Sequence, residues 1–250
     1  FVKVAVRVRP FIKEERLRGQ TARLCVAAPS RQELEITGGV ETRPQSFVFD
    51  RVYWSHDERH PLFATQATLY EELGKSMISN ALSGFNNCIF AYGQTGSGKT
   101  YSVLGQDTPE GRGLLPRVVQ GMFEDFEQAP STTLCTCVVS CMEIYNEQIR
   151  DLLAPASDEP QNLKVQAHPD RGCVVIGLKD VTVTSKDEVM NLIDQGMQLR
   201  HVSATAMNNA SSRSHCIFTF RTSVTTAEGV ERKSQTHLVD LAGSERASRT

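Results

Sequence analysis

A glycine-rich stretch that ends in a lysine and a threonine has the residue types of a phosphate-binding loop. It follows the pattern G-x-x-x-x-G-K-[ST] and consists of Gly93, Gln94, Thr95, Gly96, Ser97, Gly98, Lys99 and Thr100. Backbone amides of such a loop form a concave nest for phosphate oxygens, and glycines allow the required close approach. Lys99 adds a positive charge for β- and γ-phosphates, and the Thr100 hydroxyl can bind Mg²⁺. Because the apolar run at residues 87–92 predicts a buried strand just before the loop and a helix is expected after it, we expect a nucleotide phosphate site here.

Two later stretches have the residue types to sense the γ-phosphate of such a nucleotide. Residues 208–215 read Asn-Asn-Ala-Ser-Ser-Arg-Ser-His, between a predicted helix and a predicted strand. Residues 237–246 read His-Leu-Val-Asp-Leu-Ala-Gly-Ser-Glu-Arg, a strand ending in Asp240, where a carboxylate that acts on Mg²⁺ belongs. Each stretch alone also has a plain interpretation, because serine-rich segments are usually solvated loops and an aspartate after a strand is often a helix cap.

The composition is that of an ordinary globular protein. The chain has 250 residues, of which 40% are hydrophobic and 22% charged, with a formal net charge of -2. No overall basic field favours nucleic acid or an anionic membrane, so we expect neither as a partner, although a local basic patch can still meet an acidic surface. No apolar run approaches the roughly 20 residues of a membrane span, and no signal peptide opens the chain. Seven scattered cysteines favour reduced thiols in a cytosolic compartment.

Hydrophobic periodicity predicts strands that alternate with helices. Strands are expected at residues 2–8, 24–27, 33–36, 46–49, 87–92, 134–145, 216–224 and 235–241, and helices at residues 66–82, at residues 113–126 and after Ser185. Ser185 and Glu188 form a capping-box signature for the last of these helices. The polar segment at residues 154–172 is interpreted as a surface hairpin or loop. The alternation predicts a single domain with a mostly parallel sheet that helices cover on both faces.

Three cysteines in one predicted strand could be ligands of a metal ion. Cys135, Cys137 and Cys141 fall on one face of the strand at residues 134–145, together with Val139. Their spacing is not that of a zinc knuckle, so we interpret them as packing residues.

Four motifs in a fixed order make the chain resemble the kinesin motor domain. They are Arg7-Val-Arg9-Pro10, the phosphate loop at residues 93–100, a first switch motif at residues 208–215 and a second switch motif at residues 240–245. The resemblance runs over all 250 residues, and it is strongest to the third, cargo-transporting kinesin family. It implies an α/β, P-loop NTPase-type, three-layer motor domain with a mixed, mostly parallel central sheet and helices on both faces. Residues 1–250 would be the N-terminal two-thirds or so of that domain, with the C-terminal part missing.

The resemblance also implies how the nucleotide, ATP, is held. Arg7, Arg9 and Pro10 would contact the adenine end, and Tyr101 would cover the other face of the base, which suits a flat aromatic ring. The phosphate loop would hold the phosphates and Mg²⁺.

The metal and the attacking water would involve three side chains according to the same resemblance. Thr100 would ligate Mg²⁺ directly, and Asp240 would act on the metal through water. Ser212 would join Thr100 at the metal and help to position the attacking water.

The remaining switch residues would close the site. The Gly243 amide would sense the γ-phosphate, and Asn208 would bond to the closed switch. Arg213 and Glu245 would form a salt bridge, with the carboxylate accepting a proton through a water relay. The plain alternative for this pair is an ordinary surface ion pair of little energetic value.

The implied function is microtubule-stimulated hydrolysis of Mg·ATP that drives movement along microtubules. A kinesin relative that grips the microtubule lattice with little productive cycling is a second hypothesis, and a P-loop kinase or GTPase is a third, weakened by the lack of a lid and of a guanine-reading motif. The hairpin at residues 164–177, with Lys164, His168 and Arg171, is either a contact for the acidic tubulin surface or a solvated loop. We expect a cytoplasmic, microtubule-associated location, with cilia as one setting. Any cargo or dimer partner would bind through regions outside this chain.

Overall fold

The computed structural model describes residues 2–12, 15, 26–37, 43–155, 163–169, 172–206 and 210–245. These residues belong to two compact units, Phe1–Leu69 and Tyr70–Thr250. Each unit has sheets and a buried core of its own. The prediction of one motor domain over residues 1–250 stays a prediction.

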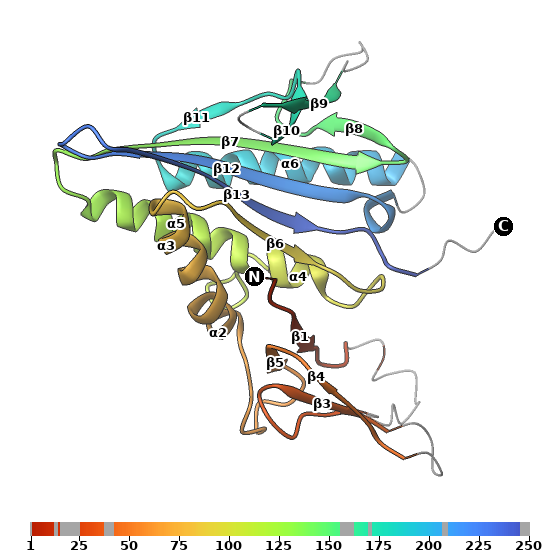
Figure 1. Ribbon diagram of the computed structural model, residues 1–250. Helices are drawn as coiled ribbons and strands as arrows, with labels where there is room; N and C mark the ends of the chain where they lie inside the picture. Colours follow the sequence, from red (N-terminus) through yellow and green to blue (C-terminus); the bar gives the residue numbers. More distant parts are fainter. Residues whose placement is uncertain are drawn as a thin grey trace. The chain divides into compact units, whose positions relative to one another are not determined.

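The first unit consists of short strands around a small apolar core. β1 (Ala5–Val8) lies parallel to β5 (Arg51–Trp54), and β2 (Val26–Ala27), β3 (Glu33–Ile36) and β4 (Gln45–Val48) form an antiparallel sheet (Figure 1). Val6 and Val8 pack against the core residues Val52 and Trp54. The strand predicted at residues 2–8 is therefore confirmed only in its second half, since Val2 is 86% exposed. Residues 24 and 25 of another predicted strand lie outside the described residues.

The second unit is organised around a six-stranded sheet. Its strands are β6 (Asn87–Ala91), β7 (Leu134–Tyr145), β8 (Gln148–Asp151), β11 (Val181–Val183), β12 (His215–Thr225) and β13 (Glu231–Asp240). They are arranged in the order β11-β7-β12-β13-β6, with β8 paired to β7 (Figure 1). A separate two-stranded sheet, β9 (Lys164–His168) with β10 (Gly172–Ile176), confirms the predicted hairpin.

The sheet is mixed, as predicted, but the expectation of mostly parallel pairing is wrong for the described strands. Among them, β11–β7, β7–β12, β12–β13 and β7–β8 are antiparallel, and β13–β6 is the parallel pair of this sheet. The reason is local. Short connections join β7 to β8 and β12 to β13, and strands joined by a tight turn must run in opposite directions. Asn146 and Glu147 take positive φ values of 48° and 62° in the first of these turns, as a two-residue hairpin requires.

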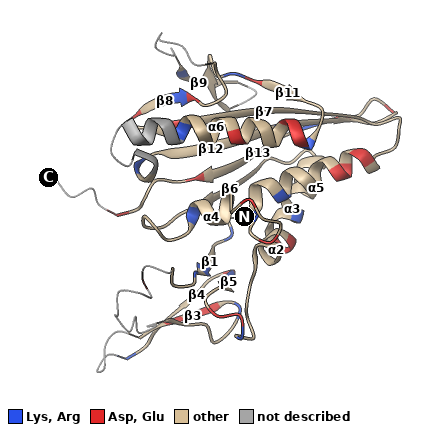
Figure 2. Ribbon diagram, turned by 180° about the vertical axis from the view of Figure 1, so that it is seen from behind, with Lys and Arg blue, Asp and Glu red and all other residues tan. Residues whose placement is uncertain are grey.

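The helices lie close to the predicted ranges. The predicted helix at residues 66–82 is formed as α2 (Gln66–Leu69), a π-helical turn (Tyr70–Gly74) and α3 (Lys75–Leu82), while α4 (Lys99–Val103) follows the phosphate loop. α5 (Leu114–Gln128) has Pro116 in its first turn and buries Leu115, Val118 and Val119 completely or nearly so. Acidic residues occupy its C-terminal part (Figure 2). α6 (Lys186–Ala206) begins after Ser185, whose Oγ accepts the Glu188 amide at 3.2 Å.

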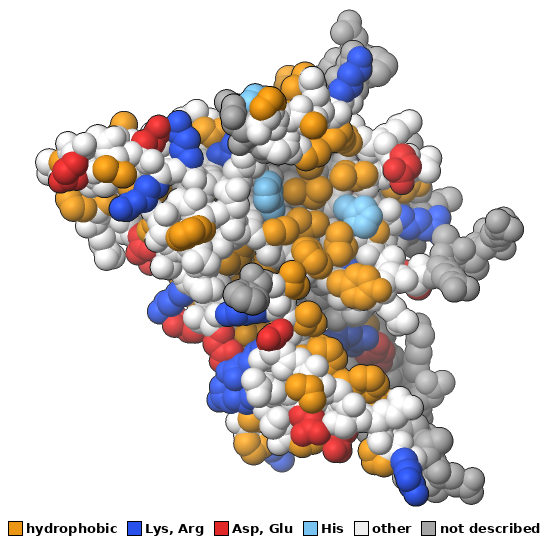
Figure 3. All heavy atoms as spheres, viewed as in Figure 1, with side chains coloured by type: hydrophobic (Ala, Val, Ile, Leu, Met, Phe, Trp, Pro, Cys, Tyr) orange, Lys and Arg blue, Asp and Glu red, His pale blue; other side chains and the backbone are white. Residues whose placement is uncertain are grey.

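Within the second unit, α3, α4, α5 and α6 form one layer against one face of the six-stranded sheet. α3 contacts β12 and β13, α6 contacts β7 and β11, and α5 contacts α3, α4 and α6. α6 is behind the sheet in Figure 1 and in front of it in Figure 2. On the opposite face Phe90 is 60% exposed, and Figure 3 shows hydrophobic side chains gathered there. Within the described residues, the predicted helical cover is thus present on one face and not on both.

The centre of the covered face is apolar and fully buried. Phe218 on β12 is 0% exposed and pairs with Leu238 on one side and Cys141 on the other. Cys137, Val139 and Cys141 share this buried face of β7, which confirms Cys137 and Cys141 as packing residues, while Cys135 is only half-buried.

Phe218→Ala should lower the free energy of unfolding by about 3–5 kcal/mol, because the side chain leaves a cavity that rigid neighbours cannot fill. The matched control is Phe85→Ala, whose side chain is 65% exposed and which should change stability by less than about 0.5 kcal/mol. Urea denaturation followed by circular dichroism measures both. Equal effects of the two substitutions would contradict this assignment of the core.

Candidate functional site

The phosphate loop connects β6 to α4, as predicted. Gly96 and Gly98 have φ values of +77° and +96°, a left-handed conformation that glycine adopts at little cost. The helix after the loop has five residues, so its dipole adds little, and backbone amides and side chains must supply most of the attraction for an anion.

Strand pairing places a carboxylate beside the start of this loop. β13 runs parallel to β6 with Asp240 opposite Ala91, so the carboxyl ends of both strands meet at one edge of the sheet. This is the position in which ligands bind in open α/β sheets. The prediction that Asp240 ends a strand next to the phosphate loop is confirmed.

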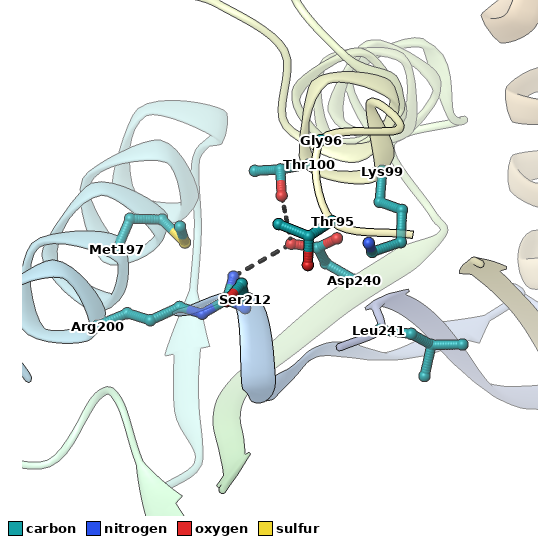
Figure 4. Close-up of a pocket in the computed structure, with 9 residues that line it drawn as sticks. All are labelled: Thr95, Gly96, Lys99, Thr100, Met197, Arg200, Ser212, Asp240 and Leu241. Carbon is teal, nitrogen blue, oxygen red and sulfur yellow. Dashed lines mark hydrogen bonds and ion pairs between the residues drawn. The ribbon is translucent and has the colours of Figure 1, made fainter. Parts of the chain in front are cut away.

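A pocket of about 220 Å³ lies at this edge (Figure 4). It is lined by Thr95, Gly96, Lys99, Thr100, Met197, Arg200, Ser212, Asp240 and Leu241. Six of these residues were predicted from the sequence, and Met197, Arg200 and Leu241 were not. Lys99 Nζ donates to the carbonyl oxygens of Gly93 and Gln94, at 2.9 Å each, which holds the ammonium group against the loop.

Asp240 links the phosphate loop to helix α6. One carboxylate oxygen, Oδ2, accepts the Thr100 hydroxyl at 2.7 Å and pairs with Arg200 at 3.1 Å, and both contacts are drawn in Figure 4. The other oxygen, Oδ1, is buried and has no hydrogen-bond partner among the described residues. A buried carboxylate oxygen without a partner is costly, so this atom has the character of a ligand for a group bound in the pocket.

Arg200 is the residue that sequence reasoning missed. Its side chain is 3% exposed and lies 3.4 Å from Glu143 and 3.1 Å from Asp240, and it donates to the Ser214 carbonyl at 3.1 Å. Ser214 in turn donates its hydroxyl to Glu143 at 2.5 Å. Together these contacts hold the end of the first switch motif against the sheet.

The sequence did contain a signal for Arg200. Along α6 up to residue 200, the part of the helix whose side chains are described, the buried positions are Val189, Ile193, Gly196 and Arg200. These positions follow the spacing of one helical face. An arginine that continues an apolar stripe must be paired, because a lone buried charge is very unfavourable.

The second switch motif contacts both other elements of the site. The Gly243 amide donates to the Ser212 carbonyl at 2.8 Å, and the Ser244 amide donates to the Gly93 carbonyl at 3.0 Å. Glu245 then reaches Thr95, whose amide donates to its carboxylate at 2.9 Å and whose hydroxyl donates to the other carboxylate oxygen.

The predicted ion pair between Arg213 and Glu245 is not formed among the described residues. The backbone contacts of Gly243 and Ser244 direct Glu245 to the phosphate loop instead, while Arg213 is exposed. The hydroxyl and then the amide of Thr95 lower the pKa of Glu245 to about 2, so the carboxylate is ionised at neutral pH. In this arrangement it is a poor proton acceptor.

The adenine contacts stay a prediction. Arg7 donates to Ser55 at 3.0 Å and to Gln66 at 2.8 Å, and Arg9 pairs with both carboxylate oxygens of Glu15. Pro10 and Tyr101 are exposed, and Tyr101 belongs to the other unit. Asn208 and Arg171 lie outside the described residues.

The sequence model of the kinesin motor domain matches residues 7–250. The chain belongs to this family. Kinesin-related protein 1 of Dictyostelium discoideum is 41% identical over 100% of this chain and 12% of its own length. For the kinesin-like protein unc-104 of Caenorhabditis elegans the identity is 42%, over 100% of this chain and 16% of that protein. Rat KIF1B is 41% identical over 100% of this chain and 14% of its own length. The predicted resemblance to the third kinesin family is confirmed, and the chain spans a small part of these relatives.

Solved kinesin structures share the fold. A fast kinesin, studied for its ATPase mechanism and its interactions with microtubules, matches with a TM-score of 0.88 and 37% identity over 100% of this chain and 67% of that chain. KIF14 with ADP in complex with a microtubule matches with a TM-score of 0.86 and 37% identity, over 99% of this chain and 70% of its own. The predicted P-loop motor fold is confirmed.

Among the described helices, none combines the length and the apolar character that a membrane span requires.

Arg200→Met should destabilise the protein by about 3–5 kcal/mol, because Glu143 and Asp240 would stay buried without their shared cation. Adding Glu143→Gln should restore part of this loss, since it removes one of the two uncompensated charges. Arg221→Met is the control, because Arg221 pairs with Asp180 at the surface and should contribute about 1 kcal/mol or less. Urea denaturation measures all four proteins. A double variant that is less stable than Arg200→Met would contradict the charge argument.

Proposed function

We propose that this chain carries the ATP-hydrolysing site of a microtubule motor, in which Mg·ATP turnover is stimulated by microtubules and drives movement along them. One observation carries the proposal. A single pocket combines the lysine and threonine of the phosphate loop, a serine of the first switch motif and the strand-end carboxylate Asp240. A simple phosphate-binding loop needs only the first two.

The oxygen atoms of the pocket suit Mg²⁺, a hard cation that prefers oxygen ligands. The Thr100 hydroxyl and Asp240 lie 2.7 Å apart, and the buried Asp240 Oδ1 has no hydrogen-bond partner among the described residues. Thr100 and Ser212 would ligate the ion, and Asp240 would hold it through water. When bound, the ion would neutralise charge on the phosphates.

The protein's own part in hydrolysis would be charge stabilisation and placement of water, because phosphoryl transfer leaves little covalent chemistry to the enzyme. Lys99 would stabilise the β- and γ-phosphates, and Ser212 would orient the attacking water. The Gly243 amide would meet the γ-phosphate after leaving the Ser212 carbonyl. Closure would bring Glu245 to Arg213, with the carboxylate accepting a proton through water and Asn208 bonding to the closed switch.

The proposed partner is the microtubule, and the proposed location is the cytoplasmic microtubule cytoskeleton. KIF14, at 37% identity, is in complex with a microtubule. In this chain the β9–β10 hairpin is exposed along most of its length and carries Lys164 and His168. An acidic protein surface would attract these basic groups.

Lys99→Ala should reduce microtubule-stimulated ATP turnover of the full-length protein by about a hundredfold or more, because a positioned positive charge at the transferring phosphate is lost. Lys186→Ala, at an exposed position of α6, should leave turnover unchanged. Steady-state phosphate release with and without polymerised tubulin measures both. If the unmodified protein bound microtubules tightly but released no phosphate above background, the lattice-gripping alternative would replace the motor proposal.

Lys164→Glu should weaken microtubule binding roughly threefold at low ionic strength, with a smaller effect at high salt, since surface charges are screened. Lys186→Glu makes the same charge change away from the hairpin and should have less effect. Cosedimentation with microtubules at two salt concentrations is the measurement. The same affinity loss for both variants would indicate net charge, and not this hairpin, as the cause.

A further inference from the structure

The groups predicted to bind phosphate or metal already have acceptors within the chain. The Lys99 ammonium donates to the Gly93 and Gln94 carbonyl oxygens, and the Gly243 amide donates to Ser212. The acceptor for Thr95, however, is not a neutral carbonyl. It is the carboxylate of Glu245, which lies 150 positions further along the chain.

This carboxylate binds the loop as an anion ligand would. The Thr95 amide donates to Oε2 at 2.9 Å and the Thr95 hydroxyl donates to Oε1, so both oxygens are engaged by one residue of the phosphate loop. The charge of Lys99 also favours the ionised form of Glu245. Charged acceptors make shorter and stronger hydrogen bonds to backbone amides than neutral ones do, and phosphate oxygens use the same kind of donors.

The surrounding chain is shaped for this contact. An added Cβ at Gly243 would lie 2.4 Å from Glu245 Oε1 and 2.5 Å from Thr95 Oγ1, so the contact requires a residue without a side chain at position 243. Gly243 and Ser244 bond to Ser212 and Gly93. The carboxylate is therefore positioned by backbone contacts from the phosphate loop and from the first switch motif.

We propose that Glu245 is an internal anion ligand of the phosphate loop, and that the phosphate chain of a nucleotide has to displace it in order to bind. The inference rests on the proposed function, since it assumes that the loop binds phosphate. Displacement frees the end of the second switch motif and removes the two Thr95 hydrogen bonds from the exposed Glu245 carboxylate. Its pKa then rises toward the ordinary value for glutamate, so the carboxylate becomes a better proton acceptor only after a nucleotide has arrived.

The size of the effect follows from competition for one site. If Glu245 occupies the loop in about nine of ten molecules, the apparent affinity for a phosphate ligand is about tenfold lower than the intrinsic affinity. Removing the carboxylate should therefore raise the apparent affinity for ligands with phosphates by about tenfold. Adenosine, which has none, should bind equally well with or without Glu245.

The experiment is isothermal titration calorimetry on the full-length protein, stripped of nucleotide, with ADP plus Mg²⁺, pyrophosphate and adenosine as probes. Glu245→Ala should bind ADP and pyrophosphate about tenfold more tightly than the unmodified protein. Glu110→Ala, an exposed carboxylate elsewhere in the chain, should match the unmodified protein. ADP is used because it lacks the γ-phosphate that the Gly243 amide would meet.

A second variant distinguishes the contact between Glu245 and Thr95 from simple repulsion between the Glu245 charge and the phosphates. Gly243→Ala keeps the charge of Glu245 but leaves no room for the contact, and the backbone at this position does not take a positive φ value. It should therefore tighten ADP binding as Glu245→Ala does. If Glu245→Ala tightens binding and Gly243→Ala does not, repulsion explains the result and the proposed contact is overturned.

Amide hydrogen exchange provides a measurement that needs no nucleotide. The Thr95 amide should exchange several times faster in Glu245→Ala than in the unmodified protein, because its acceptor is gone. Unchanged exchange together with unchanged ADP affinity would overturn the inference and leave the proposed function standing. If no protein binds ADP or pyrophosphate, the proposed function fails as well.

Discussion

The geometry of the site depends on one interaction, the buried pairing of the Arg200 guanidinium with Glu143 and Asp240. Glu143 and Asp240 are 5% and 1% exposed, and burying two acidic side chains at such a depth is very unfavourable unless a nearby cation pairs with them. Arg200 supplies that cation from a helix, while its contact with Ser214 holds the end of the first switch motif. Because Asp240 is fixed in this way, the Thr100 hydroxyl of the phosphate loop has a defined partner.

Strand register explains why one arginine can serve both carboxylates. Cys216 on the central strand β12 pairs with Glu143 on one side and Asp240 on the other, so the two acidic residues are two strands apart, roughly 10 Å between their Cα atoms. Between them lies a small, fully buried side chain. A residue as large as Phe218, which is the next inward-facing residue on the same strand, would occupy the space that the guanidinium needs. The covered face of the sheet is therefore polar at the end that holds the pocket and apolar at its centre.

Part of the fold and part of the candidate site could be predicted from the sequence. The physical reason differs between the elements. Residues 134–145 and the start of α6 were predicted well, because alternation and a capping box are local signals. β5, β8 and β11 were missed, because a strand of three or four residues gives only a weak period, which was enough to predict β3 and β4 but not these three. Asp240 was predicted because its place at a strand end is encoded in neighbouring residues. The helical stripe of α6 marks position 200 as buried, but the partner of Arg200 lies 40 positions away. The contact between Glu245 and Thr95 spans 150 positions, and no local pattern specifies either partner.

The hydrogen-bond donors of the site are paired with acceptors from different segments of the chain. A ligand that takes over these donors would therefore detach those segments. The acceptor for Gly243 comes from the first switch motif, and the acceptor for Thr95 comes from the second. A ligand that takes over these donors gains little from new hydrogen bonds as such, because it replaces existing ones. What changes is which segments stay attached to the phosphate loop. If the site binds phosphate as proposed, binding and loss of phosphate would shift the attachment of both switch motifs at a small net cost. A modest difference in affinity would drive such a balanced exchange in either direction.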